Sequence, residues 1–379
     1  MILLSLGTLL MHILVGNVLP MLLVLGIVVF VHELGHFIVG RLCGVGVSTF
    51  SMGFGPELFG FNDRKGTRWR VAAMPLGGYV KFYGDQNAAG MPDDAALAKM
   101  SPEMRRQSLP AQPVWARALI VAAGPVANFI LAIAIFSATA YFYGRQTLTP
   151  RIEQVEPASP AAAAGFLPGD LVLQIDGQPI AGFSDIQQIV STHPGTTLTF
   201  VVERQGRQVT LTATPVLSDV KTPFGRQNIG RVGVAPSTDP SDIHYTYPTP
   251  LGAIGSGISD TYGFIEKTLG YVAGILMGRE SASQLSGPLG IGQAVGVVAS
   301  WGLVPFFNFI AWMSVSVGLI NLFPIPLLDG GHLLFFAIEG SRGRPLSERT
   351  QEMGFRMGLA FVVALMLFVT VNDIWRITS

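Results

Sequence analysis

The stretch VVFVHELGHFIVG, residues 28–40, places two histidines and a glutamate in an otherwise apolar run. Ionisable residues at the centre of a membrane-spanning helix cost about 2.5–3.5 kcal/mol each on insertion scales, so three together indicate a function. His32 and His36 are four residues apart and lie on one helical face, where both imidazoles can bind one zinc ion. Glu33 lies beside the first histidine and can act as general base without binding the metal.

A catalytic tetrahedral zinc needs a third protein ligand. The motif NLFPIPLLDGGHLLFF, residues 321–336, contains Asp329 near the cytoplasmic end of the third expected span, at a depth similar to that of the histidines. Its prolines and glycines interrupt a helix, and irregular backbone at membrane depth is tolerated where it is buried in protein or lines a polar cavity. We predict Asp329 as the third ligand. The alternatives are a capping role for Asp329 and ligation by His332.

Composition sets the class of protein. Of the 379 residues, 49% are hydrophobic and 13% are charged, about half the charged share of a soluble domain. The chain is therefore an integral membrane protein, and its net charge of +0 gives no electrostatic support to nucleic-acid binding. The stretches that supply the roughly 20 apolar residues of a spanning helix are residues 18–40, 116–142, 303–327 and 354–372.

Two further apolar segments are less regular. Residues 1–16 extend the first span or lie at the interface, and residues 251–278 are predicted to form an amphipathic, interfacial helix, with a fifth span as the alternative. Basic residues gather in the connections 41–117 and 338–353, and none precedes Arg41. We therefore expect both connections to face the cytoplasm, and both termini and the region between the second and third spans to lie outside it.

Between those spans the sequence alternates short β-branched runs with turn signals, which predicts a compact α+β domain. We expect a hairpin at Asp176-Gly177, a short helix capped by Ser184, and two strands joined at Gln205-Gly206. The predicted divisions are an N-terminal membrane core, this domain, a linker with the interfacial helix, and a C-terminal membrane core: 1–143, 144–216, 217–280 and 281–379.

The cytoplasmic stretch RWRVAAMPLGGYVKFYG, residues 68–84, is interpreted as two short β runs joined by Pro75, Leu76, Gly77 and Gly78. A helical substrate hides its amides in its own hydrogen bonds and must unfold locally before water can attack it. An exposed strand edge here could pair with the unfolded peptide, which makes the two glycines candidate substrate-binding residues in a membrane-associated hairpin. The alternative is an ordinary cytoplasmic hairpin.

The HExxH motif in the first span and NLFPIPLLDGG in a late one together resemble the site-2 protease family of intramembrane zinc metalloproteases, of the regulator of sigma-E protease type. The stretches SMGFGPELFGF, RVAAMPLGGYVKFYGD and AAGPVANFILA fit the same family. The resemblance covers most of the chain and implies zinc (Zn2+) ligation by His32, His36 and Asp329, with Glu33 as catalytic base. It also implies that Asn321 lies by the substrate backbone.

The stretch SPAAAAGFLPGDLVLQIDGQPI resembles a PDZ domain, which implies peptide capture by β-augmentation. Regulator of sigma-E proteases carry two such domains, whereas this chain has room for one. The resemblance implies a polytopic α-helical protein of the bacterial inner membrane, with about four transmembrane helices and the PDZ-like domain outside the cytoplasm. Its expected partners are the lipid bilayer, a single-span membrane substrate such as an anti-sigma factor, and a peptide ligand of the PDZ-like domain.

The leading hypothesis is therefore a zinc metalloendopeptidase that acts inside the membrane. One alternative is a catalytically silent membrane PDZ adaptor, which would have little reason to keep Glu33 because that residue need not bind the metal. Another is a metal or ion transporter, in which polar residues would be spread over more of the spanning helices. Asn128 in the second span has two interpretations, a buried amide contact near the site or polar glue between helices.

Overall fold

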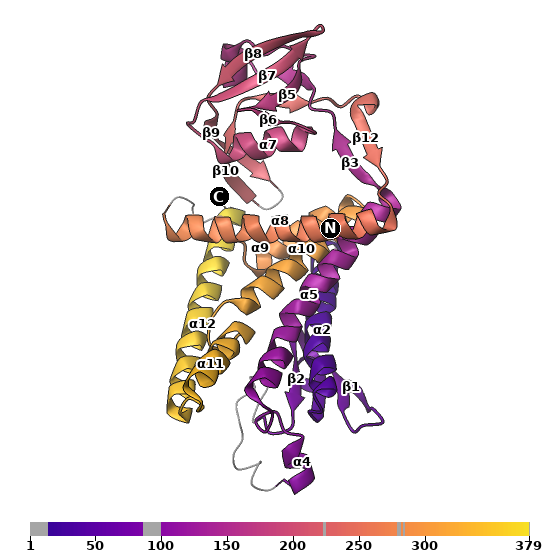
Figure 1. Cartoon of the computed structure of the whole chain (residues 1–379), viewed down its shortest axis with the longest axis vertical. Coiled ribbons are helices and arrows are strands. Elements are labelled where there is room, and N and C mark those ends of the chain that lie inside the picture. The colour runs from indigo at the N-terminus through magenta and orange to yellow at the C-terminus, as the bar shows by residue number, and fades with distance from the viewer. Residues whose placement is uncertain (1–13, 86–99, 223–224, 279–281, 283–284, 379) are drawn as a thin grey trace, which may run out of the picture. The chain divides into compact units, whose positions relative to one another are not determined.

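The computed structural model describes residues 14–85, 100–222, 225–278, 282 and 285–378 (Figure 1). The chain divides into two compact units, Met1–Ala138 with Ile254–Ser379 and Thr139–Ala253, each of which is described by itself. The expectation for the first residues of the chain falls mostly outside the described part, which begins at Leu14.

The first unit is mostly helical. A π-helical turn, η1, precedes the long helix α2, and the remaining helices follow in chain order: η1 (Leu14–Val18), α2 (Leu19–Leu42), α4 (Pro102–Arg106), α5 (Val114–Tyr143), α8 (Pro250–Leu276), α9 (Pro288–Ser300), α10 (Leu303–Leu322), α11 (Asp329–Arg342) and α12 (Glu348–Thr378).

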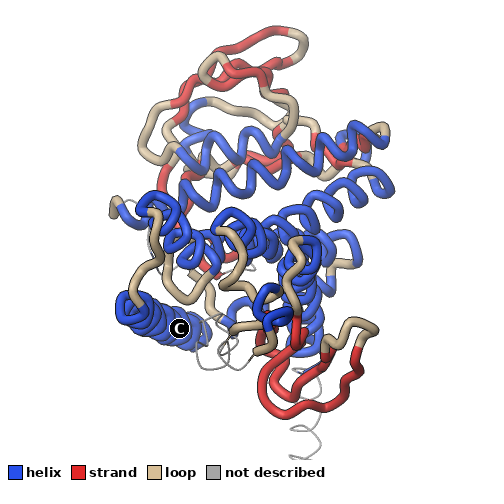
Figure 2. Tube along the Cα trace, turned by 60° about the horizontal axis from the view of Figure 1, so that its bottom comes forward, coloured by secondary structure: helices blue, strands red, loops and turns tan. Residues whose placement is uncertain are grey.

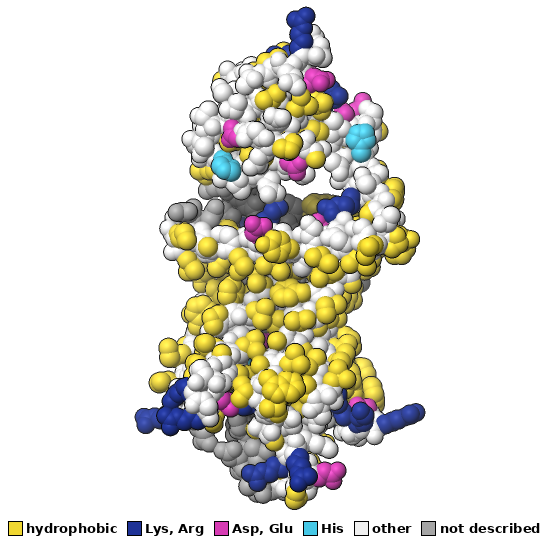
Figure 3. Space-filling model, in the orientation of Figure 1, with side chains coloured by type: hydrophobic (Ala, Val, Ile, Leu, Met, Phe, Trp, Pro, Cys, Tyr) yellow, Lys and Arg dark blue, Asp and Glu magenta, His cyan; other side chains and the backbone are white. Residues whose placement is uncertain are grey.

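Four stretches within the described residues are helical, long and apolar enough to cross a membrane, and they lie where the four spans are predicted. They are Leu14–Leu42, Val114–Tyr143, Leu303–Leu322 and Arg349–Arg376. Figure 3 shows apolar side chains covering the visible face of these helices, with Lys and Arg gathered beyond one end. Helix α8 is not among these spans. It carries exposed apolar side chains at helical spacing, among them Ile254, Ile258, Tyr262 and Leu269.

The third span is shorter than the sequence predicts. Helix α10 ends at Leu322 rather than at residue 327, because Pro324 and Pro326 cannot continue the helical hydrogen-bond ladder. Asp329 is therefore not on the third span but is the first residue of α11. Leu327, two residues before it, has φ +95°, a conformation that branched side chains rarely adopt.

Helices α2 and α5 pack closely through small residues. A Cβ on Gly35 of α2 would lie 2.4 Å from the Ala123 carbonyl oxygen of α5 and 2.8 Å from the Ala127 side chain. Helix α5 is also tied to α10, because the Ser314 hydroxyl donates to the Asn128 carbonyl over 2.8 Å. The glycine thus sets the distance between the first two spans, as small residues do in membrane helix pairs.

The connection between the first two spans forms a sheet from two long strands, β1 (Val47–Asn62) and β2 (Arg68–Phe82). The segment 49–52 of β1 lies between two parts of β2, in register with 78–81 on one side and 68–71 on the other, and 59–62 also pairs with 68–71. The two predicted β runs of β2 therefore point in opposite directions, and the chain reverses between residues 71 and 78 as well as at 63–67. The two runs do not pair with each other as in a simple hairpin, because 49–52 of β1 lies between them.

The second unit is built on a four-stranded sheet of order β6-β5-β7-β8 with helices packed on it (Figure 2). Its elements are β3 (Arg145–Leu148), β4 (Ile152–Val155), α6 (Pro160–Ala164), β5 (Leu171–Ile175), β6 (Gln178–Pro179), α7 (Phe183–Thr192), β7 (Leu198–Arg204), β8 (Arg207–Ala213), β9 (Val216–Thr222), β10 (Gly225–Arg231), β11 (Val234–Pro236), η2 (Pro240–Asp242) and β12 (Ile243–Thr246). Its core includes Ile175, Phe183, Ile186 and Phe200.

Both predicted turns in this unit are confirmed. β5 and β6 pair about Asp176-Gly177, and β7 and β8 pair about Gln205-Gly206, with positive φ at each of the four turn residues. The predicted cap of α7 is wrong: the helix begins at Phe183, and the Asp185 carboxylate accepts from the Gly182 backbone N–H over 3.2 Å.

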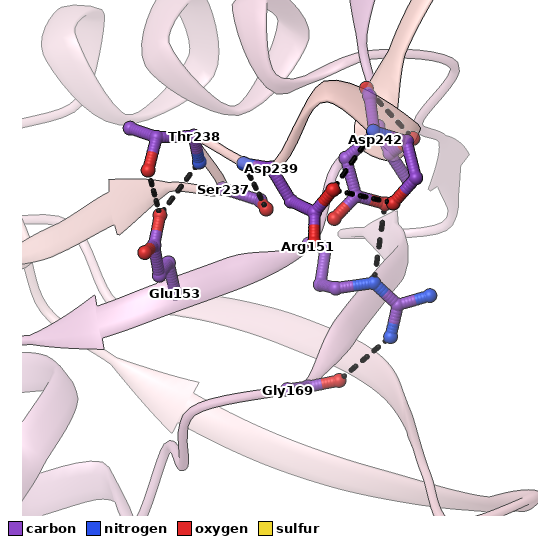
Figure 4. A network of polar contacts seen from close by, with 9 residues as sticks. Arg151, Glu153, Gly169, Ser237, Thr238, Asp239 and Asp242 are labelled. Carbon is purple, nitrogen blue, oxygen red and sulfur yellow. Dashed lines mark hydrogen bonds and ion pairs between the residues drawn. The ribbon is translucent and has the colours of Figure 1, made fainter.

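The unit also extends beyond the predicted boundary at residue 216. β11 pairs with β4, and β12 pairs with β3, so that the returning chain belongs to the same compact unit as far as Ala253. Figure 4 shows the polar contacts that hold this return. The Glu153 carboxylate accepts from the Thr238 backbone N–H over 2.6 Å, and Arg151 donates to both Asp242 and the Gly169 carbonyl.

Asp85, just after β2, is a buried carboxyl that generates a pH prediction. It is 6% exposed, and its Oδ2 accepts from the Phe82 N–H over 3.0 Å. Within the described part of the chain, its Oδ1 has no hydrogen-bond partner. Burial raises the pKa of Asp85 to about 7 from its ordinary value of 3.8. The folded state therefore favours the neutral acid. The contribution of Asp85 to the free energy of unfolding is fully present below about pH 4 and is lost as pH rises towards 7.

Asp85→Asn should raise the melting temperature of the detergent-solubilised protein more at pH 8 than at pH 5, by at least about 3 °C. Asp239→Asn is the control, because the hydrogen bond from the Ser241 backbone N–H lowers the pKa of that exposed carboxyl. It is ionised at both pH values, so this variant should change the melting temperature equally at pH 5 and pH 8. Equal effects of Asp85→Asn at both pH values would show that the carboxyl is ionised in the folded protein.

Candidate metal centre

The two histidines of α2 lie side by side as their spacing predicts. His32 and His36 are each 8% exposed, and their Nε2 atoms are 3.2 Å apart. Both are in the second half of α2, towards the end followed by β1. Helix α2, which is otherwise largely apolar, thus presents two imidazole nitrogens at one point.

Asp329 joins them from a distant part of the chain. Its Oδ2 lies 3.1 Å from His32 Nε2 and 3.5 Å from His36 Nε2. Ligand atoms about 2.0–2.1 Å from a tetrahedral zinc are about 3.3 Å from one another, which is the spacing of these three atoms. The buried Oδ2 accepts no hydrogen bond within the described residues, as expected of an oxygen reserved for a cation. The donor set fits zinc.

The outer ring nitrogen of His36 fixes its orientation. Its Nδ1 lies 2.9 Å from the Ile120 carbonyl oxygen of α5, so Nδ1 carries the proton and Nε2 is left free for the metal. This carbonyl is a functional group that sequence reasoning missed, because a backbone oxygen has no residue signature.

Asn128 performs the same task for His32. Its side-chain amide lies 3.2 Å from His32 Nδ1, and its Oδ1 is buried without a hydrogen-bond partner in the described residues. Exchanging the amide O and N would let Oδ1 accept from a protonated Nδ1, which satisfies both groups and frees His32 Nε2. Of the two interpretations of Asn128, the geometry favours the contact at the site.

Gly124 gives the metal centre its room. A Cβ at this position would lie 2.3 Å from His36 Nε2 and 2.9 Å from the His32 ring. Any side chain would therefore occupy the space into which the two donor nitrogens point. The sequence motif AAGPVAN thus places a glycine and an amide on one face of α5, and both face the histidines.

Glu33 lies beside the donor atoms without joining them. The donor atoms that lie close enough together to hold one metal ion come from His32, His36 and Asp329. The backbone N–H of Val80 hydrogen-bonds to the Glu33 carboxylate. A Cβ on Gly78 would be 3.1 Å from Glu33 Cγ, so strand β2 runs directly past this carboxylate. This is the arrangement expected of a base rather than a ligand.

Two other residues singled out by the sequence, Asn321 and His332, lie outside the group of donor atoms. Asn321 lies on the last turn of α10, one turn beyond Gly318, whose Cα faces Pro125 and Asn128 of α5. His332 packs its ring 5.3 Å from that of Phe355 and is not part of the donor group. The structure thus supports Asp329, not His332, as third ligand.

The described geometry agrees with comparisons to known proteins. A family model described as peptidase family M50 matches residues 20–365. A relative from Agrobacterium fabrum, named as a zinc metalloprotease, is 44% identical over 95% of this chain and 96% of its own. The metalloprotease MmpA of Caulobacter vibrioides is 41% identical over 94% of both chains.

Among solved structures, the PDZ domain of an SdrC-like protein from Listeria monocytogenes matches 23% of this chain and 84% of that chain, with 17% identity and a TM-score of 0.20.

The prediction from this geometry concerns Gly124. Gly124→Ala should lower zinc affinity at least about tenfold, because the methyl group would overlap the donor nitrogens. Zinc content and affinity would be measured on purified protein by chelator competition. Gly26→Ala on α2 is the matched control, since nothing lies within 4 Å of the Cβ that it adds. Unchanged affinity in the first variant would place the metal elsewhere.

Proposed function

The chain belongs to peptidase family M50 and is a zinc metalloprotease, and from this premise we propose that it cleaves membrane proteins within or near their spanning segments. The observation that carries the proposal is the convergence of His32, His36 and Asp329 from helical elements of a membrane unit, with Glu33 beside them. Because the donor atoms belong to spanning or adjoining helices, a peptide bond reaching them must come from a chain within the bilayer or at its edge.

The adaptor hypothesis is not favoured. An adaptor would have no use for two buried imidazoles and a carboxylate whose donor atoms lie at the spacing of zinc ligands. The transporter hypothesis would need donors spread along a path. Those described here gather at one point.

The hydrolysis follows from the positions of the residues. When bound, zinc would supply a Lewis acid that polarises the scissile carbonyl and acidifies water. Glu33 accepts the proton of the attacking water while the water oxygen bonds to the carbonyl carbon. The Glu33 carboxyl then delivers that proton to the leaving amide nitrogen as the C–N bond breaks. Asn321 is proposed to hydrogen-bond to the substrate backbone from the end of α10.

The edge of β2 is proposed to hold the substrate as a strand. Backbone groups of successive strand residues point to opposite edges, and Val80 points its N–H to Glu33. Gly78, two residues earlier, therefore presents its backbone on the same edge, and Gly77 has φ +108° at the adjoining bend. A peptide paired here would be extended, with its carbonyls open to water.

The hairpin itself is proposed to touch the membrane. It exposes large apolar side chains, among them Phe54, Leu58, Phe59 and Phe61. Water-exposed strands seldom carry so many, whereas an interfacial hairpin would bury them.

The localisation and partners are also proposals. Basic residues gather in the connections 41–117 and 338–353, which favours a cytoplasmic location for both connections. The proposed membrane is the bacterial inner membrane, with the second unit outside the cytoplasm. A peptide ligand of the second unit is proposed to pair with β11. One edge of β11 pairs with β4, and none of the described strands pairs with its other edge, where a peptide could add. A single-span protein such as an anti-sigma factor is the proposed substrate class.

The central test is Glu33→Gln. We expect cleavage of single-span membrane substrates in detergent to fall about 10²–10⁴-fold, because the amide cannot accept the proton of water, while zinc stays bound. Cleavage is measured on a substrate panel and zinc on the same preparations. Glu103→Gln, an exposed position on α4, is the matched control. Retained cleavage in Glu33→Gln would refute the assignment of the base.

Strand capture makes a separate prediction for a cleaved substrate. Replacing single backbone N–H groups near the scissile bond by ester oxygens should lower kcat/KM about tenfold at alternate positions and little at those between. The reason is that only every second residue of a strand faces the edge of β2. Synthetic single-span peptides with one ester each provide the series. An effect without a period of two would argue against pairing at this edge.

A further inference from the structure

The donor set of the metal centre comes from two separately supported parts of the chain. His32 and His36 belong to α2, which packs on α5. Asp329 begins α11, which is joined to α10 through an irregular segment that contains Pro324, Pro326 and the positive-φ residue Leu327. Such a connection does not fix the direction of the following helix as a continuous helix would. Other contacts must therefore hold α11 against α2 and α5.

Contacts with α12 fix one side of α11 and the segment before it. A Cβ on Gly358 would lie 1.8 Å from the Pro326 carbonyl oxygen, and a Cβ on Gly354 would lie 3.0 Å from the Phe335 ring. These contacts bind the segment to the last span. They do not bind it to α2, which carries both histidines, or to α5.

Arg117 makes that second connection. It lies in the first turn of α5, and its guanidinium is 2.5 Å from the Glu339 carboxylate of α11. The same guanidinium lies 4.9 Å from the centroid of the Phe336 ring, and its Nε donates to the Gln112 carbonyl over 3.1 Å. The two charged side chains are 15% and 14% exposed, so their attraction is less screened by water than that of a surface pair.

Arg117 and the α5 groups that contact the metal centre lie on the same face of α5. Arg117, Gly124 and Asn128 are separated by seven and four residues, which brings them onto one stripe of the helix. The Ile120 carbonyl that holds His36 is one turn from Arg117. One face of α5 therefore holds the two histidines at one end and α11 at the other.

We propose that the Arg117–Glu339 pair, with Phe336, is a positioning element that holds Asp329 against His32 and His36 and so retains the zinc. The inference rests on the proposed function, since it requires the three donors to bind that ion. Glu339 is ten residues from Asp329, about 15 Å along α11. Release of this end lets α11 tilt on its irregular connection, which moves the carboxylate from the histidine nitrogens.

The test removes both charges at once, so that no lone charge is left buried. In the double variant Arg117→Met with Glu339→Met, we expect zinc to be released about tenfold faster into excess chelator, while the melting temperature of the zinc-free protein changes by no more than a few degrees. Zinc release is followed with a chromogenic chelator on the full chain in detergent, without any substrate.

The control is Glu352→Met with Arg356→Met, an exposed pair on α12 with the same residue types and an N–O distance of 2.6 Å. Arg117→Lys is a second variant, which keeps the charge but loses the planar contact with Phe336, and zinc release should be intermediate. Release from both Arg117 variants at the wild-type rate would overturn the proposal. Wild-type protein that binds no zinc would overturn the proposed function instead.

Discussion

The convergence of two imidazoles and a carboxylate on one point of a membrane unit is the constraint on which the rest of the structure depends. The Asp329 Oδ2 is buried, accepts no hydrogen bond within the described residues and lies about as far from each histidine nitrogen as ligands of one zinc ion do. Burial removes the hydration of these three groups, and a metal ion bound by all three donor atoms offsets that loss. The surrounding helices must therefore supply both the space for the ion and the support that keeps the donors together.

That requirement explains the small residues between the first two spans. Gly35 lets the α5 backbone approach α2, and Gly124 leaves the volume in front of the histidine nitrogens free. The same approach brings the Ile120 carbonyl to the outer nitrogen of His36. Helix contact, ring orientation and metal space thus follow from one close crossing, which larger side chains on either helix would prevent.

The sequence predicts what depends on local spacing and misses what depends on folding. The pair His32 and His36 needs only the helical repeat, and the turns of the second unit need only their Asp-Gly and Gln-Gly residues. The Ile120 carbonyl has no signature, and the pairing of β11 with β4 joins segments about 80 residues apart, so the domain boundary at residue 216 could not be seen. The sheet of β1 and β2 shows the same limit, since the two β runs of β2 pair with 49–52 of β1 on either side rather than with each other.

The position of the centre along the spans reconciles a polar reaction with an apolar surrounding. His36 is six residues from the end of α2, about 9 Å along the helix, and Asp329 opens a helix rather than standing in the middle of one. The sheet beside Glu33 follows that end of α2 directly. The free-energy cost of burying a charged group falls towards the membrane interface, so water and a charged carboxylate are tolerated there more easily. A substrate helix must also be unwound to be cut, and its peptide groups are more easily hydrated near that interface than at the bilayer centre. The donors therefore lie where hydrolysis needs the least desolvation. The close helix packing that Gly35 and Gly124 allow, and the contact of Arg117 with α11, keep them in the protein interior.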